Sequence, residues 1–278
     1  MSCVAFSPDG TLLATGGFDA AVKLWDPATG RERGDLGPGK APVSSLAFAP
    51  DGRTLAVARW GAENDKSGVV QLWGLPDRKL IATLTGHTEA IWTVSFSPDG
   101  ATLATGSQDG TARLWDLKTR RQHKVLVSDP KTVVAACFSP KGDLVATAST
   151  APDPATPNAV GALRLWTRGT GNDWTEQFLG HGPRGQRVSL AFSPDGKSLA
   201  STGESVDIWE IKRRTRVATV AADRLATFSA DGKSLIVGRD DNVLAVLPVA
   251  QFIVGTETPR TETPDRPRDK RAQNEETP

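Results

Sequence analysis

The sequence has few of the side chains that carry enzyme chemistry, and it has no excess of charge. Its 278 residues include two cysteines and three histidines, and 33 basic residues nearly balance 32 acidic ones. Two cysteines cannot form a disulfide framework, which favours a reducing compartment and predicts a cytoplasmic protein. A formal charge of +1 gives no overall attraction to nucleic acid or to an anionic membrane.

Long apolar runs are also missing. No stretch approaches the roughly 20 residues of a membrane-spanning helix, so we expect no membrane association. The first residues, MSCVAF, lack the basic start and apolar stretch of a secretory signal, and we expect none. No long helical period is present either, which leaves short strands as the building elements of the fold.

One five-residue phrase recurs six times. It reads FSPDG, or a close variant, starting at Phe6, Phe48, Phe96, Phe138, Phe192 and Phe228. Within the phrase, proline presets a turn, aspartate can bond to nearby backbone, and glycine tolerates a positive φ. The starts are separated by 42, 48, 42, 54 and 36 residues. A repeat of about 40–45 residues with four strands per unit is typical of a propeller blade.

The third unit shows the expected strands most clearly. Its strands are predicted at residues 91–96, 102–107, 111–115 and 121–127, with turns between them. A single sheet of this kind cannot bury both faces, whereas radial packing buries each sheet against its neighbours. We therefore predict an all-β propeller of about six four-stranded blades over residues 1–254, with an incomplete last blade. Residues 255–278 are polar and rich in proline, which predicts a disordered tail.

These repeats resemble the Trp-Asp (WD) repeat family, with turn phrases closest to its bacterial members. Trp25-Asp26 and Trp115-Asp116 match the family signature, and drifted copies follow Leu72, Leu165 and Ile208. Gly86-His87 and Gly180-His181 match the family's Gly-His element. The resemblance implies a buried hydrogen-bond network in the third unit, formed by His87, Thr105 or Ser107, Asp109 and Trp115.

The search for catalytic or metal-binding groups yields no candidate. His87 and His181 are expected to be buried structural donors, and Cys3 and Cys137 small core residues. The Asp-Gly pairs close turns and lack the spacing of calcium ligands. No histidine, cysteine or aspartate cluster has metal-ligand spacing, and no phosphate-binding glycine loop is present. We therefore predict no catalytic residue, metal or cofactor, and a protein that is not an enzyme.

The binding face is expected where the connections between second and third strands emerge together. Two units carry long insertions there, at residues 59–68 and 149–161, and such insertions often mark the binding face of a repeat protein. The first insertion offers an aromatic side chain beside charges, and two further candidates lie at the central end of first strands. The candidate protein-binding residues are Trp60, Glu63, Asp65, Lys66, Trp92 and Arg224. The alternatives are a Trp60 folded over its own blade and a Trp92 that only packs between blades.

The function predicted from these features is a non-enzymatic scaffold that binds an unidentified protein or peptide, as a free-standing protein or a regulatory module of a larger one. The alternatives are a small-ligand sensor or enzyme that uses the central channel, and a structural spacer without a ligand. Nucleic-acid binding is disfavoured because the basic clusters fall on predicted outer strands without aromatic stacking residues. Self-association through an open seam between the last and first blades is a further expectation.

Overall fold

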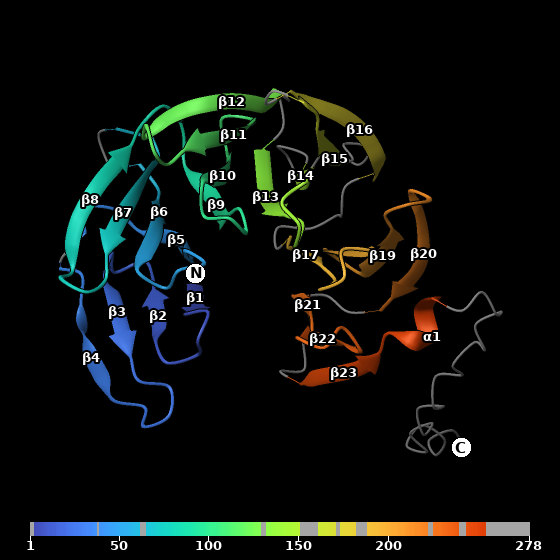
Figure 1. Cartoon of the computed structure of the whole chain (residues 1–278), viewed down its shortest axis with the longest axis horizontal. Helices are drawn as coiled ribbons and strands as arrows, with labels where there is room; N and C mark the ends of the chain where they lie inside the picture. Colours follow the sequence, from blue (N-terminus) through green and yellow to red (C-terminus); the bar gives the residue numbers. More distant parts are fainter. Residues whose placement is uncertain are drawn as a thin grey trace, which may run out of the picture.

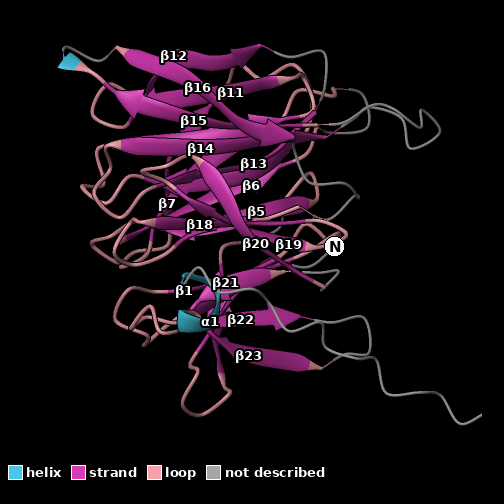
Figure 2. Cartoon of the chain, turned by 90° about the vertical axis from the view of Figure 1, so that its right-hand side faces the viewer, coloured by secondary structure: helices cyan, strands magenta, loops and turns pink. Residues whose placement is uncertain are grey.

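The structure is a computed structural model of the chain, and it describes residues 3–37, 39–61, 65–128, 132–150, 161–170, 173–181, 188–221, 225–238 and 243–253. Six antiparallel sheets stand around a common axis as the blades of a propeller (Figure 1). Seen from the side, their strands cross the thickness of a disc, with connections at its two faces (Figure 2). The predicted propeller is confirmed.

Each strand pairs with the next strand in the chain, so every blade is a simple meander. Blades 1 and 2 contain β1 (Cys3–Phe6), β2 (Leu13–Gly16), β3 (Val22–Trp25), β4 (Glu32–Asp35), β5 (Val43–Phe48), β6 (Thr54–Arg59), β7 (Val69–Gly74) and β8 (Lys79–Leu84). Blades 3 and 4 contain β9 (Ile91–Phe96), β10 (Thr102–Ser107), β11 (Thr111–Asp116), β12 (Arg121–Ser128), β13 (Thr132–Phe138), β14 (Leu144–Thr150), β15 (Ala162–Arg168) and β16 (Trp174–His181). Blades 5 and 6 contain β17 (Leu190–Phe192), β18 (Ser198–Thr202), β19 (Val206–Glu210), β20 (Thr215–Val220), β21 (Ala226–Phe228), β22 (Ser234–Gly238) and β23 (Leu244–Pro248).

The repeated phrase forms the turn between the first two strands of each blade. In blade 3, the Ser97 hydroxyl donates to Asp99 at 2.5 Å and accepts the Thr102 amide at 2.9 Å. Gly100 closes the turn at φ 69°, where a side chain would be strained. The same serine-to-aspartate bond recurs in blades 1, 5 and 6. This local chemistry explains why the phrase predicts the position of each turn.

The core lies between blades rather than inside a single sheet. Alternate residues of each strand point toward the preceding and the following blade, as the two faces of a pleated sheet require. Between blades 2 and 3, for example, Leu72 and Leu84 pack against Ile91, Leu103 and Trp115. The innermost strands pack in sequence from β1 through β5, β9, β13 and β17 to β21.

Blade 6 differs from the others in the part of the chain that is described. It has three strands, and β23 is followed by a short helix, α1 (Ala250–Ile253), that packs against β20. An incomplete last blade was predicted, and the sheet order agrees with it. The tail predicted at 255–278 lies outside the described residues. The described helix is far too short to cross a bilayer.

Candidate functional site

Three aromatic side chains from three different blades meet at the face predicted for binding. Phe18 follows β2, Trp60 follows β6, and Trp92 is the second residue of β9. The ring centroids of Phe18 and Trp60 are 5.2 Å apart, and those of Trp60 and Trp92 are 5.3 Å apart, both with edge-to-face geometry. We call Phe18, Trp60 and Trp92 the aromatic cluster.

The aromatic cluster combines exposed ring surface with unsatisfied polar groups. Phe18 is 56% exposed, while Trp60 and Trp92 are half-buried. The Nε1 atoms of both tryptophans are buried and have no hydrogen-bond partner. An unpaired buried donor costs about 1–3 kcal/mol, and such groups are uncommon in native structures. The ring contacts place Trp60 between Phe18 of blade 1 and Trp92 of blade 3, instead of folded back over its own blade.

A buried arginine fixes the backbone next to the aromatic cluster. Arg59, 3% exposed, donates from Nη1 to the carbonyl oxygens of Ala20 at 2.9 Å and Ala41 at 2.7 Å. Its Nε donates to Gln71 at 2.8 Å. Burial lowers the pKa of Arg59, and no described carboxylate forms an ion pair with it. Arg59 thus links blades 1 and 2 and places a positive charge beside Trp60.

The structure describes two of the other candidate binding residues. Asp65 and Lys66 are exposed, and a hydrogen bond from the Ser67 amide lowers the pKa of Asp65. Glu63 and Arg224 lie outside the described residues. Phe18 was missed from the sequence, although a signal for it exists. Phe18 and Trp60 each stand twelve residues after the phenylalanine of their own turn phrase, so aligning the repeats places them at equivalent positions.

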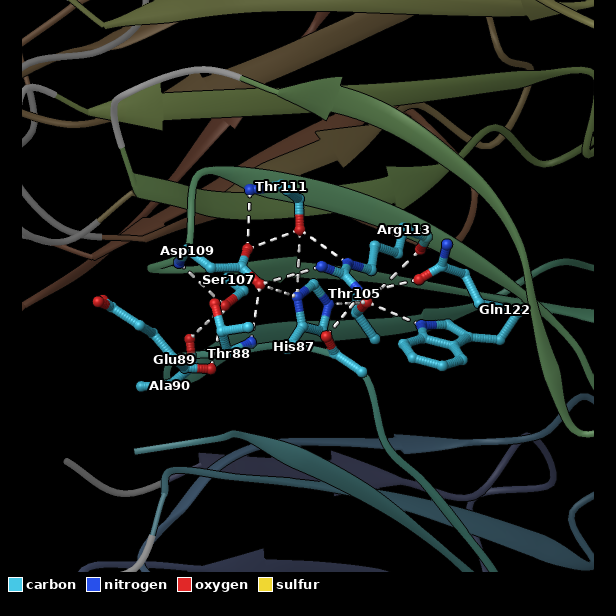
Figure 3. A network of polar contacts seen from close by, with 12 residues as sticks. His87, Thr88, Glu89, Ala90, Thr105, Ser107, Asp109, Thr111, Arg113 and Gln122 are labelled. Carbon is cyan, nitrogen blue, oxygen red and sulfur yellow. Dashed lines mark hydrogen bonds and ion pairs between the residues drawn. The ribbon is translucent and has the colours of Figure 1, made fainter. Parts of the chain in front are cut away.

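A separate polar network lies inside blade 3 (Figure 3). Trp115 Nε1 donates to Thr105 Oγ1 at 2.9 Å, and Thr105 Oγ1 lies 2.7 Å from His87 Nε2. His87 Nδ1 lies 2.8 Å from the Asp109 carboxylate. Asp109 also accepts the Thr111 hydroxyl at 2.6 Å and lies 3.4 Å from Arg113 Nη2. Thr105, rather than Ser107, therefore provides the hydroxyl group of the polar network.

The network holds His87 neutral. Burial lowers the pKa of His87, and the charge of Arg113 lowers it further, against the opposing effect of Asp109. A neutral ring accepts a hydrogen bond from Thr105 at Nε2 and donates one from Nδ1 to Asp109. Each donor from Trp115 through Thr105 and His87 to Asp109 then has an acceptor. Burial opposes ionisation of Asp109, but hydrogen bonds from His87 and Thr111 outweigh it and hold the pKa of Asp109 well below its usual range. The polar network therefore has a structural role.

Ser107, the alternative candidate for the network, has another role. Its hydroxyl reaches the backbone carbonyl oxygens of Ala90 at 2.9 Å and Glu89 at 3.1 Å. It therefore ties the end of β10 to the segment that enters β9. In blades 1, 4 and 5 the tryptophan donates to a hydroxyl at the equivalent place, from Trp25 to Thr15, Trp166 to Thr147 and Trp209 to Ser201.

The expectation of a buried His181 was wrong. His181 is exposed at the end of β16, where its ring lies 6.0 Å from that of Phe178. Unit five has too short a second connection to bring an aspartate to this histidine, and no described aspartate bonds to its ring. A Gly-His pair therefore does not by itself predict a buried histidine.

Neither cysteine is arranged for nucleophilic chemistry. Burial raises the pKa of Cys3 to about 11 and that of Cys137 to about 12. A thiol with so high a pKa holds its proton at neutral pH, whereas the thiolate is the reactive form. Among the described residues, no group of three or more histidine, cysteine, aspartate or glutamate side chains is placed to hold a metal ion.

A small cavity lies between blades 2 and 3, on the side of the turn phrases. Its volume is about 240 Å³, and its lining includes Asp51, Phe96, Asp99 and Arg120. Ligand pockets for drug-sized molecules are usually about 300–1,000 Å³ and mostly enclosed. The cavity is smaller than that, and it opens away from the aromatic cluster.

Comparisons with known proteins all point to one family. The family described as "WD domain, G-beta repeat" matches residues 1–26, 33–73, 78–116 and 174–207, together half of the chain. The chain is 35% identical over 113 residues to transducin beta-like protein 3 of Bos taurus, covering 39% of this chain and 13% of that protein. It is 35% identical over 101 residues to WD repeat and SOCS box-containing protein 1 of Homo sapiens, covering 36% and 23%. These matches span under a quarter of each relative's length.

A solved structure resembles the whole fold. Kuenenia stuttgartiensis hydrazine synthase superimposes with a TM-score of 0.74 over 89% of this chain and 83% of that chain. Its sequence identity is 18%, so the likeness concerns the fold alone.

Proposed function

The chain belongs to the WD-repeat family, and we propose that it is a non-enzymatic scaffold that binds a protein or peptide through the aromatic cluster. The observation that carries this proposal is the meeting of Phe18, Trp60 and Trp92 at one loop face, from three separate blades. Aromatic side chains at the centre of a rigid face are the usual anchors of protein interfaces.

The chemistry of the face indicates what a partner should present. The buried positive charge of Arg59, with which no described carboxylate forms an ion pair, favours negative charge on the partner. Phe18 offers exposed apolar surface to the same partner. A peptide that carries negative charge beside an apolar side chain satisfies both needs, since the apolar side chain covers the Phe18 ring.

A small-ligand function has less support. It would need convergent polar or metal-binding groups at the central channel, and the described cavity lies instead between blades 2 and 3. The roles as a regulatory module, the bacterial character of the repeats and the cytoplasmic location stay predictions.

The proposal is tested with two exposed phenylalanines of similar accessibility. Phe18 is 56% exposed in the aromatic cluster, and Phe178 is 59% exposed on the outer strand β16. Proteins captured from a native extract by the wild-type chain are identified and measured. Phe18→Ala should reduce capture of the specific partner by at least about tenfold, the effect of losing one interface anchor. Phe178→Ala should leave it unchanged.

Thermal unfolding of both variants separates loss of binding from loss of folding. Both should melt within about 2 °C of the wild type, because surface changes usually alter stability by less than about 0.5 kcal/mol. Equal capture by wild type and Phe18→Ala would disprove the binding role of the cluster. Capture that falls steeply with added salt and contains nucleic acid would instead favour the nucleic-acid interpretation.

A further inference from the structure

Five of the six turn phrases end in the same reactive dipeptide, aspartate followed by glycine. In such a pair the aspartate side chain can attack the backbone, because glycine has no Cβ atom to shield the next amide nitrogen. All five aspartates are exposed, and they are Asp9, Asp51, Asp99, Asp195 and Asp231. The repeat therefore presents the same dipeptide in five similar turns, whose side-chain contacts can be compared directly.

In four of these turns a serine holds the aspartate side chain. The Ser97 hydroxyl donates to Asp99 at 2.5 Å, and the equivalent bonds of blades 1, 5 and 6 are 2.6–2.7 Å long. Ser97 Oγ also accepts the amide of Thr102 at 2.9 Å, so the hydroxyl is fixed from both sides. The bond from Ser97 is the main reason that the pKa of Asp99 is lowered, and an ionised carboxylate is a poor target for ring closure.

The turn of blade 2 has the same backbone but no such hydroxyl, because Ala49 stands in the place of the serine. The Ala49 amide donates to Thr54 at 2.8 Å and the Gly52 amide donates to Ala49 at 2.9 Å, the same lengths as in blade 3. Among the described residues, the only hydrogen bond to Asp51 comes from the Arg53 amide, at 2.8 Å. The second carboxylate oxygen of Asp51 therefore has no described partner.

The cavity between blades 2 and 3 gives the Asp51 side chain space in which to turn. Ala49 and Asp51 line this cavity, and Asp99 of the following blade lines it as well. Asp99 borders the same space but stays bonded to Ser97. Asp51 and Asp99 are therefore a matched pair within one molecule, and the serine hydroxyl is the main difference between them.

We propose that Asp51 is a site of spontaneous modification, at which aspartate converts to isoaspartate faster than in the other four turns. The Gly52 nitrogen attacks Cγ of the protonated Asp51 carboxyl group, and the hydroxyl group leaves Cγ and departs with the amide proton as water. Solvent water then opens the resulting succinimide ring. Attack at the former backbone carbonyl gives isoaspartate, whereas attack at Cγ restores aspartate. No atom is oxidised or reduced.

The product would alter a turn that lies between two neighbouring blades. In isoaspartate the main chain runs through Cγ and is longer by one methylene group. A Cβ atom built on Gly52 would lie 3.7 Å from Pro8 of blade 1, and one built on Gly100 would lie 3.6 Å from Pro50. A longer chain between Pro50 and Gly52 therefore changes the contacts of blade 2 with both neighbours.

The rates are measured at all five turns of the full-length chain. The protein is incubated at 37 °C and pH 6, digested at intervals and mapped by mass spectrometry with a fragmentation method that distinguishes isoaspartate from aspartate. Isoaspartate should accumulate at Asp51 about tenfold faster than at Asp99, since a charge-assisted hydrogen bond corresponds to at least about that factor. In the chain unfolded by urea, the two rates should become similar, because the serine bond is lost.

Two variants exchange the single group that distinguishes the turns. Ala49→Ser supplies the missing hydroxyl beside the cavity and should slow Asp51 to the rate of Asp99. Ser97→Ala should accelerate Asp99 to the rate of Asp51. The rate at Asp195 in blade 5 is the reference in both variants, because a local effect leaves it unchanged whereas a general loosening of the fold raises it.

Three results would overturn the proposal. The first is an equal rate at Asp51 and Asp99 in the folded wild type, and the second is a rate at Asp51 that Ala49→Ser does not lower. The third is a difference between the two sites that persists in urea, which would assign it to the local sequence. The capture experiment with Phe18→Ala is independent of all three, since the cavity opens away from the aromatic cluster.

Discussion

Replacing Thr105 by valine should destabilise the protein more than the same change in any other blade. Thr105 is 0% exposed, and its hydroxyl satisfies two buried partners, Trp115 at 1% and His87 at 2% exposed. Valine keeps the volume but leaves the indole N–H and the imidazole Nε2 unpaired. At about 1–3 kcal/mol for each orphaned group, Thr105→Val should cost about 2–6 kcal/mol.

Two other blades provide the comparison. Thr147→Val in blade 4 orphans only the Trp166 indole, at 5% exposed, and should cost about 1–3 kcal/mol. Thr15→Val in blade 1 should cost less still, because Trp25 is half-buried and water can reach it. The assay is urea denaturation of each full-length variant followed by tryptophan fluorescence, with free energies compared at a common slope. Equal losses of unfolding free energy for Thr105→Val and Thr147→Val would refute the idea that His87 belongs to the polar network.

Two further predictions follow from the pKa shifts. The pKa of His87 is lowered in the fold, so the unfolded chain binds the extra proton first, and stability should fall as the pH drops below about 6.5, by up to about 1.4 kcal/mol per pH unit. His87→Gln should remove this dependence between pH 7.5 and 5 when denaturation is repeated at each pH, and an unchanged slope would contradict a neutral His87. The raised pKa values of Cys3 and Cys137 predict that neither thiol reacts with a disulfide reagent at pH 8 until the chain unfolds, which is measured by absorbance with and without denaturant; rapid labelling of the native protein would contradict it.

Several features could be predicted from the sequence because they depend on residues close together in the chain. The turn phrase works through contacts within a few positions, such as Ser97 to Asp99, and its recurrence therefore located the first turn of each blade. The strands of blade 3 were predicted to within one residue of their observed ends. The resemblance to the WD-repeat family indicated the members of the polar network in the third unit, apart from the choice between Thr105 and Ser107.

Other features depended on contacts between residues far apart in the chain, which no local pattern encodes. Thr105 and Ser107 lie on one face of β10, and only their three-dimensional neighbours distinguish the network hydroxyl from the one that holds a loop. His181 shares its Gly-His motif with His87 but bonds to no described aspartate, and it is exposed. In both cases the outcome depends on residues outside the motif itself.

The sequence by itself determined the repeat, the turns, the number of blades and the candidate face, because each is set by side chains that act over a few residues. The tertiary structure alone decided that Phe18 joins Trp60 and Trp92, since their contacts connect three blades. It also decided that the apolar faces of blades 1 and 6 are uncovered, because burial depends on which sheets come to lie against each other. Val246 and Leu114 occupy the same place in their repeats, and only the presence or absence of a following blade separates 64% from 0% exposure.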